Sequence, residues 1–224
     1  MAGRKYFWDP FPETTTKSKT LTRTKYEDQN KNCTIVACNV TTGMTVRNPS
    51  QGGSLRDIED DATVLVHADG DWKTNVIGNT RNVEVGGTVE LITPAKLATM
   101  LRLDGLPITH IWIRLLSCYG GGLSPVDTFH DAKLQAASCF AKVLAQVLGA
   151  THRMIRVGGY NGSTVTALGK TQVYLMPHEG KVSSSDLFPS GGALIDWYDY
   201  SGRKLASKRE NLALDLELIS IMRM

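Results

Sequence analysis

The chain lacks the long apolar run that a membrane-spanning helix requires. None of its uninterrupted apolar stretches approaches the roughly 18 residues of such a span. The N-terminal segment 1–12 carries Arg4 and Lys5, followed by aromatic, acidic and proline residues, and it has no apolar signal core. We therefore expect a protein without a membrane span and without Sec-type export.

Cysteines and excess charge are also scarce. The four cysteines, Cys33, Cys38, Cys118 and Cys139, have no secreted disulfide framework around them, which favours free thiols in a reducing cytosol. No histidines lie near Cys33 and Cys38, so we expect no metal site there. The net charge of +3 is too small to predict nucleic-acid binding. The glycine runs fit neither the dinucleotide-binding pattern nor the phosphate-loop pattern.

Composition divides the chain into two parts. Residues 1–31 are rich in threonine and lysine and show neither a helical nor a strand period, so we expect a flexible polar arm. Residues 32–224 are expected to form a single domain, which at this length buries a substantial core. Across the chain, 42% of residues are hydrophobic and 21% are charged, as in ordinary globular proteins.

The hydrophobic pattern predicts alternating strands and helices. We expect strands within 33–46, 62–66, 111–116 and 154–157, helices at 94–103 and 131–148, and a hairpin from 164–166 and 172–176. A strand, helix and strand in succession form a right-handed crossover, which places both strand ends on one edge of a parallel sheet. The sequence therefore predicts an α/β fold with a mostly parallel sheet flanked by helices and a β-hairpin extension toward the C-terminus.

Two of these strands deliver a reactive side chain at their carboxyl ends. The strand at 62–66 runs into His67, and the strand at 111–116 runs into Ser117 and Cys118. Ligands of open α/β sheets bind just beyond such strand ends. An imidazole close to a thiol promotes the thiolate, which is the nucleophilic form. We therefore predict a dyad in which Cys118 attacks a carbonyl carbon and His67 protonates the leaving amine.

The oxyanion that develops in such a reaction requires backbone N–H donors at the same strand ends. The amides of Cys118 and of Ala68 or Asp69 are the candidates. The glycine run Gly120–Gly122 carries no side chains, so it would let a substrate approach the backbone closely. Asp61 and Asp69 are both candidates for orienting the imidazole, and their spacing selects neither.

The two strand-end motifs resemble those of the caspase-like (clan CD) cysteine peptidases. They read Val-Leu-Val-His67-Ala68 and Arg-Leu-Leu-Ser117-Cys118, and the two reactive residues lie 51 positions apart, within the usual range of that clan. Ala68 stands where the clan usually has glycine. The resemblance implies a dyad of His67 and Cys118 with no third side chain.

Within the clan, the chain is most similar to the autoprocessing cysteine peptidase domains of large bacterial toxins and to related injected effectors. Segment 92–98 resembles their helix between the catalytic strands, 138–144 the helix after the cysteine, and 154–159 the next strand, which helps to form the substrate cleft. The resemblance covers roughly residues 62–176.

The resemblance implies an endopeptidase, active as a monomer, that cleaves a specific host protein. Substrate contacts are then expected from Ser117, Gly158 and Tyr160. Because toxin-type members favour leucine before the cut, Leu21 in the polar arm is a candidate self-cleavage site. Such a toxin or effector is made in the bacterial cytoplasm and then secreted into the host cytosol.

Toxin-type members are activated by inositol hexakisphosphate, and a polyanion of this kind requires many converging lysine and arginine donors. Basic residues cluster toward both ends of the chain. The candidate polyanion-binding residues are Lys19, Arg23, Lys25, Arg153, Arg156, Arg203 and Lys204.

Two other functions remain open. A cysteine-dependent deamidase or acyltransferase would use the same dyad on a side-chain amide or a thioester. A non-catalytic binding module would keep the fold without the activity, and the departure at Ala68 is the feature that favours it.

Overall fold

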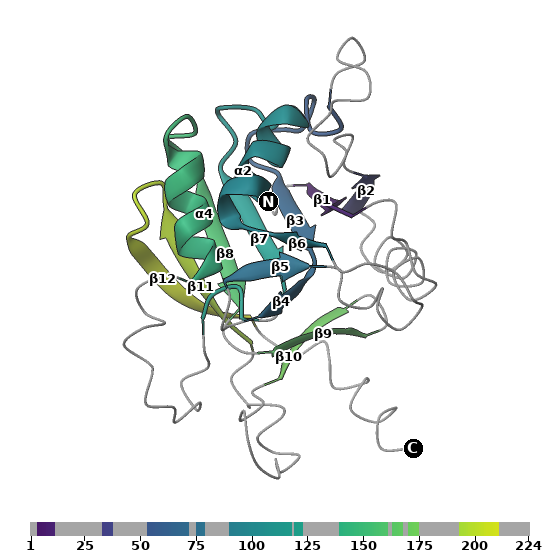
Figure 1. Ribbon diagram of the computed structural model, residues 1–224, viewed down its shortest axis with the longest axis vertical. Coiled ribbons are helices and arrows are strands. Elements are labelled where there is room, and N and C mark those ends of the chain that lie inside the picture. The colour runs from purple at the N-terminus through teal and green to yellow at the C-terminus, as the bar shows by residue number, and fades with distance from the viewer. Residues whose placement is uncertain are drawn as a thin grey trace.

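The computed structural model describes residues 4–11, 33–37, 53–71, 75–78, 90–117, 119–122, 139–160, 163–167, 170–174 and 193–210. Cys118, Lys19, Arg23, Lys25 and Leu21 lie outside these ranges. Figure 1 shows a twisted central sheet with the two helices α2 and α4 on one of its faces. No helix among the described residues is long and apolar enough to cross a membrane.

Seven strands form the central sheet. Their order across it is β2 (Cys33–Ala37), β1 (Lys5–Asp9), β3 (Thr63–His67), β7 (Trp112–Leu116), β8 (Arg156–Tyr160), β11 (Ala193–Asp199) and β12 (Lys204–Glu210). The strands from β2 to β8 run parallel to one another, whereas β11 and β12 are antiparallel to their neighbours. A mostly parallel sheet with helices confirms the predicted α/β class.

Two smaller sheets accompany the central one. A three-stranded antiparallel sheet contains β4 (Asp69–Asp71), β5 (Val76–Gly78) and β6 (Leu91–Ile92). A hairpin of β9 (Ser163–Ala167) and β10 (Lys170–Tyr174) confirms the predicted hairpin, with bounds shifted by one or two residues.

The N-terminus departs from the expected polar arm. Lys5–Asp9 is strand β1, which lies between β2 and β3 inside the sheet. Tyr6 and Trp8 pack against the helix-bearing face, and Phe7 packs against the opposite face. The expectation of an arm is therefore wrong for residues 5–9, because consecutive strand residues face opposite sides of the sheet and these aromatic side chains fill the core on both. Residues 12–31 lie outside the described ranges.

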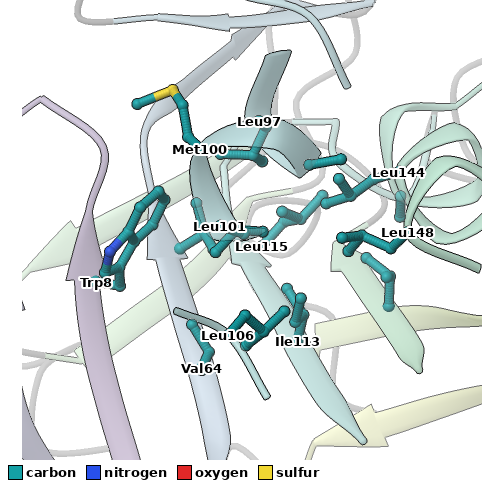
Figure 2. Packing of buried hydrophobic residues seen from close by; sticks show 14 of the residues in the cluster. Trp8, Val64, Leu97, Met100, Leu101, Leu106, Ile113, Leu115, Leu144 and Leu148 are labelled. Carbon is teal, nitrogen blue, oxygen red and sulfur yellow. The ribbon is translucent and has the colours of Figure 1, made fainter. Parts of the chain in front are cut away.

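Helix α2 (Pro94–Leu103) has the predicted bounds. The Thr93 side chain caps it by accepting a hydrogen bond from the amide of Lys96 at 3.2 Å, and Pro94 occupies the first turn. Helix α4 (Phe140–Gly149) covers the second half of the predicted 131–148 helix, and residues 131–138 lie outside the described ranges. Figure 2 shows leucines of both helices packed over the inner strands.

Candidate functional site

The parallel strands of the central sheet end together at one edge, here called the carboxyl edge. Numbered by their succession in the chain, these five strands have the order 2-1-3-4-5, a doubly wound order whose switch point lies between β1 and β3. Ligands of such sheets bind outside the carboxyl ends of the strands at the switch point. Asp9, His67 and Leu116 are the last residues of β1, β3 and β7 at this edge.

His67 is held at the carboxyl edge by pairing on both sides of β3. It is in register with Leu116 of β7, and its ring lies 5.3 Å from the ring of Phe7 on β1, with a tilt of 32°. The His67 side chain is half-buried. Its register partner precedes Cys118 by two positions, and Cys118 itself lies outside the described residues. The structure thus brings His67 beside the chain that leads into the predicted nucleophile.

Asp9 is a residue that the sequence analysis did not select. Trp8 is in register with Val66, so the next pair along the two strands is Asp9 and His67. The Asp9 side chain is fully buried, and its Oδ1 accepts a hydrogen bond from the amide of Phe11 at 2.8 Å. The only sequence signal was an acid directly after an aromatic run and before a proline, which marks a strand end.

The backbone at Ala68 differs from the expected oxyanion site. The Ala68 amide is directed at the carbonyl oxygen of Leu116, with an N···O distance of 3.4 Å. This amide therefore continues the ladder between β3 and β7 and is not turned toward a substrate. Asp69, whose amide is the other candidate donor after β3, begins β4 and is in register with Gly78 of β5.

The glycine run after β7 has a packing role. A Cβ added to Gly159 of β8 would lie 2.3 Å from the carbonyl carbon of Gly120 and 2.4 Å from the nitrogen of Gly121. Gly121 donates to the carbonyl oxygen of Tyr160 at 2.8 Å, and the amide of Ala141 donates to Gly120 at 2.9 Å. The turn after β7 thus lies directly on β8 and against the start of α4, so its glycines serve close packing rather than the predicted approach of a substrate.

The predicted substrate contacts on β8 are buried. Tyr160 is fully buried, its hydroxyl accepts a hydrogen bond from Arg114, and the guanidinium lies 5.0 Å from the ring centre. A Cβ at Gly158 would lie 2.9 Å from the Trp197 ring, so this glycine makes room for the indole. The Ser117 side chain is 1% exposed, and its hydroxyl has no hydrogen-bond partner within the described part of the chain. The side chains of Ser117 and Tyr160 and the backbone of Gly158 are therefore buried, contrary to the expected substrate contacts.

The described basic candidates gather at the opposite, amino edge of the sheet, where β7 and β8 begin. Arg156 is in register with Asp199, and Arg203 forms an ion pair with that carboxylate at 3.1 Å. Burial acts to raise the pKa of Asp199, but hydrogen bonds from Ser201 and Arg203 outweigh it and hold the pKa below its usual value. Two further members of the group have partners of their own. Arg153 stacks on Tyr200, and Lys204 pairs with Asp196 at 2.5 Å.

This basic group is separated from His67 by the length of the sheet. The four intervals between five consecutive strand residues, at about 3.3 Å each, place the two edges roughly 13 Å apart. The remaining candidates, Lys19, Arg23 and Lys25, lie outside the described residues. No group of three or more metal-ligating side chains occurs among the residues that the structure describes.

No model of a known protein family and no curated protein matches the chain, so its function has to be inferred from the carboxyl edge itself.

Proposed function

We propose that the protein is a cysteine endopeptidase that uses His67 and Cys118. The observation that carries this proposal is the register of His67 with Leu116 on adjacent parallel strands. Adjacent strands lie about 4.8 Å apart, so the imidazole and the residues that follow Leu116 share one end of the sheet. The order of the parallel strands puts the same pair next to the switch point, where ligands bind.

In the proposed reaction, His67 accepts the proton of the Cys118 thiol, and the resulting thiolate attacks the carbonyl carbon of the scissile peptide bond. The C–N bond then breaks, and the imidazolium returns its proton to the leaving amine. Water, deprotonated by the same imidazole, hydrolyses the acyl-enzyme and restores the thiol. With the Ala68 amide engaged by Leu116, this proposal leaves the amide of Cys118 as the oxyanion donor.

The finer assignment within this class follows from the same features. The strand order and the positions of the two motifs support a caspase-like fold, and the resemblance to autoprocessing domains supports a bacterial toxin or effector that acts in a host cell. The cluster of Arg153, Arg156, Arg203 and Lys204 supports activation by inositol hexakisphosphate. Self-cleavage at Leu21 is part of the same proposal.

The proposal is tested by incubating wild-type and Cys118→Ala protein with and without inositol hexakisphosphate and measuring intact mass. We expect trimming in the wild type alone, with a rate that rises on addition of the polyanion. A panel of protein substrates and a cysteine-reactive peptide probe extend the test to cleavage of other chains. Absence of cleavage and of probe labelling at Cys118 would refute the peptidase. A change of about one mass unit on an intact target would instead identify a deamidase.

A non-catalytic binding module is the second candidate, favoured by the Ala68 amide that points at Leu116. In that case the carboxyl edge would bind a partner without turnover. Equal affinity of wild-type and Cys118→Ala protein for a captured target, together with no product, would support this alternative.

A further inference from the structure

We propose that Asp9, delivered by the N-terminal strand β1, is the acid that positions His67. This inference rests on the proposed function, because it assigns an orienting partner to the proposed catalytic base. It adds a third strand to the site, which then spans β1, β3 and β7 on both sides of the switch point.

The sheet geometry brings the two side chains together. The β1–β3 ladder pairs Phe7 with Leu65 and ends at Trp8 with Val66, and extending it by one residue on each strand places Asp9 opposite His67. Because alternate residues of a strand share a face, Asp9 lies on the face of Phe7, and His67 lies on the face of Leu65. Phe7 and Leu65 pack in the same buried cluster, and the contact of 5.3 Å between the Phe7 and His67 rings places the imidazole on that face as well.

The Asp9 carboxylate is fixed from one side. Its Oδ1 accepts the Phe11 amide at 2.8 Å, in a turn that ends β1 at Pro10. This hydrogen bond restrains the orientation of the carboxylate. Because the side chain is fully buried, water does not compete for its hydrogen bonds. Its second oxygen, Oδ2, is the group that we assign to a ring N–H of His67. The other ring nitrogen is then left to exchange the proton with Cys118, while the Asp9 carboxylate orients the ring.

The same structure argues against the two acids near His67 in sequence. Asp61 precedes β3 and is exposed at the amino edge, about 20 Å from His67 at 3.3 Å per strand residue. Asp69 belongs to β4, which leaves the central sheet to pair with β5. Asp9, one residue beyond the last β1–β3 pair, is therefore the acid that we assign to His67.

The test compares Asp9→Asn with Asp69→Asn as a matched control in the full chain. Asparagine keeps the oxygen that accepts the Phe11 amide, so the turn is retained while the charge is removed. Ring ¹⁵N resonances of His67, assigned with a His67→Gln variant, report which nitrogen holds the proton, and kcat and KM are measured on a cleaved substrate. We expect one fixed tautomer in the wild type, a mixture in Asp9→Asn, and the wild-type pattern in Asp69→Asn.

The kinetic expectation is a fall in kcat of roughly tenfold to 10⁴-fold with little change in KM, since a positioning acid acts mainly on the transition state. A wild-type tautomer and kcat in Asp9→Asn, or a change confined to Asp69→Asn, would overturn the inference while leaving the peptidase intact. If no protein variant cleaves any substrate, the proposed function fails, and the His67 tautomer alone decides the inference. If Asp9→Asn does not fold, slow exchange of a His67 ring N–H in the wild type supports the contact, and fast exchange contradicts it.

Discussion

Replacement of Trp8 tests whether the N-terminal segment is an arm or a structural strand. The side chain is fully buried against the helix-bearing face, and its Nε1 donates to Oδ2 of Asp104 at 2.5 Å. Asp104 follows the last turn of α2 and also accepts hydrogen bonds from the amide of Ser54 at 2.9 Å and from the Ser54 hydroxyl. Trp8 therefore joins β1 to the end of α2 and to the loop before β3.

The cost of Trp8→Ala follows from the buried area and the lost donor. An indole that buries about 150–250 Å² contributes about 4–6 kcal/mol at roughly 25 cal/mol per Å². Measured tryptophan-to-alanine losses in cores are about 3–5 kcal/mol. Removal of a donor to a buried carboxylate adds about 1–3 kcal/mol. The measured packing loss and the lost donor together give about 4–8 kcal/mol, a large part of the roughly 5–15 kcal/mol by which domains are stable.

Because the alanine variant is close to unfolding, Trp8→Phe provides the measurable intermediate. It keeps most of the ring and removes the donor, so we expect a loss of about 1–3 kcal/mol in urea unfolding. Combining it with Asp104→Asn in a double-mutant cycle isolates the hydrogen bond, and the two losses should be clearly less than additive. Ile108→Ala, at a side chain that is 68% exposed, serves as the control and should cost less than about 0.5 kcal/mol.

A loss below about 1 kcal/mol for Trp8→Ala would refute this reasoning. It would mean that β1 does not contribute to the core and that the N-terminal segment is an arm after all. Additive losses in the double-mutant cycle would refute the indole-to-carboxylate bond alone, leaving the packing intact.

Three further predictions follow from the same structure. Gly159→Ala would force a methyl group against the backbone of Gly120, so we expect a loss of at least about 1–3 kcal/mol in urea unfolding, whereas an unchanged midpoint would contradict that close packing. Burial lowers the pKa values of His110 and His152 below 6.5. Below about pH 6.5 the unfolded chain therefore binds protons that the folded chain does not, and the free energy of unfolding decreases. The urea concentration at the unfolding midpoint should therefore decrease as the pH is lowered from about 7.5 to 5.5. The decrease should be smaller in the His110→Gln, His152→Gln double variant, and an equal decrease in both proteins would exclude these histidines. After a cut behind Leu21, the fragment that carries β1 should stay bound, because β1 pairs with both β2 and β3. Gel filtration should therefore separate the two pieces only in denaturant, and dissociation in native buffer would contradict this.

Much of the fold follows from local patterns in the sequence. The cap at Thr93, the proline after it and the helical spacing of apolar residues placed α2 at its observed bounds. Short β-branched runs placed β3 and β7, and the crossover rule placed their ends on one edge. These features succeed because they depend on neighbours within a few positions of the chain.

Other features depend on contacts between distant segments. The Tyr6-Phe7-Trp8 run lies in a segment that is mostly polar, and it forms a buried strand because β2 and β3 pair with it from positions some 30 and 60 residues later. The glycines after β7 suggest an open substrate path until Gly159 is placed against them. The basic residues of the last third gather with Asp199 and Tyr200 only because β11 pairs with β8.

The candidate site divides in the same way. His67 and Cys118 are predicted from the residue pattern alone, since each follows a buried strand whose end is visible in that pattern. That β1 pairs with β3 and that the Ala68 amide is directed at Leu116 became visible only in the folded sheet, and the assignment of Asp9 to His67 rests on that pairing. Strand order and register are set by the burial of whole faces, so no local pattern around Asp9 can reveal which strand lies beside it.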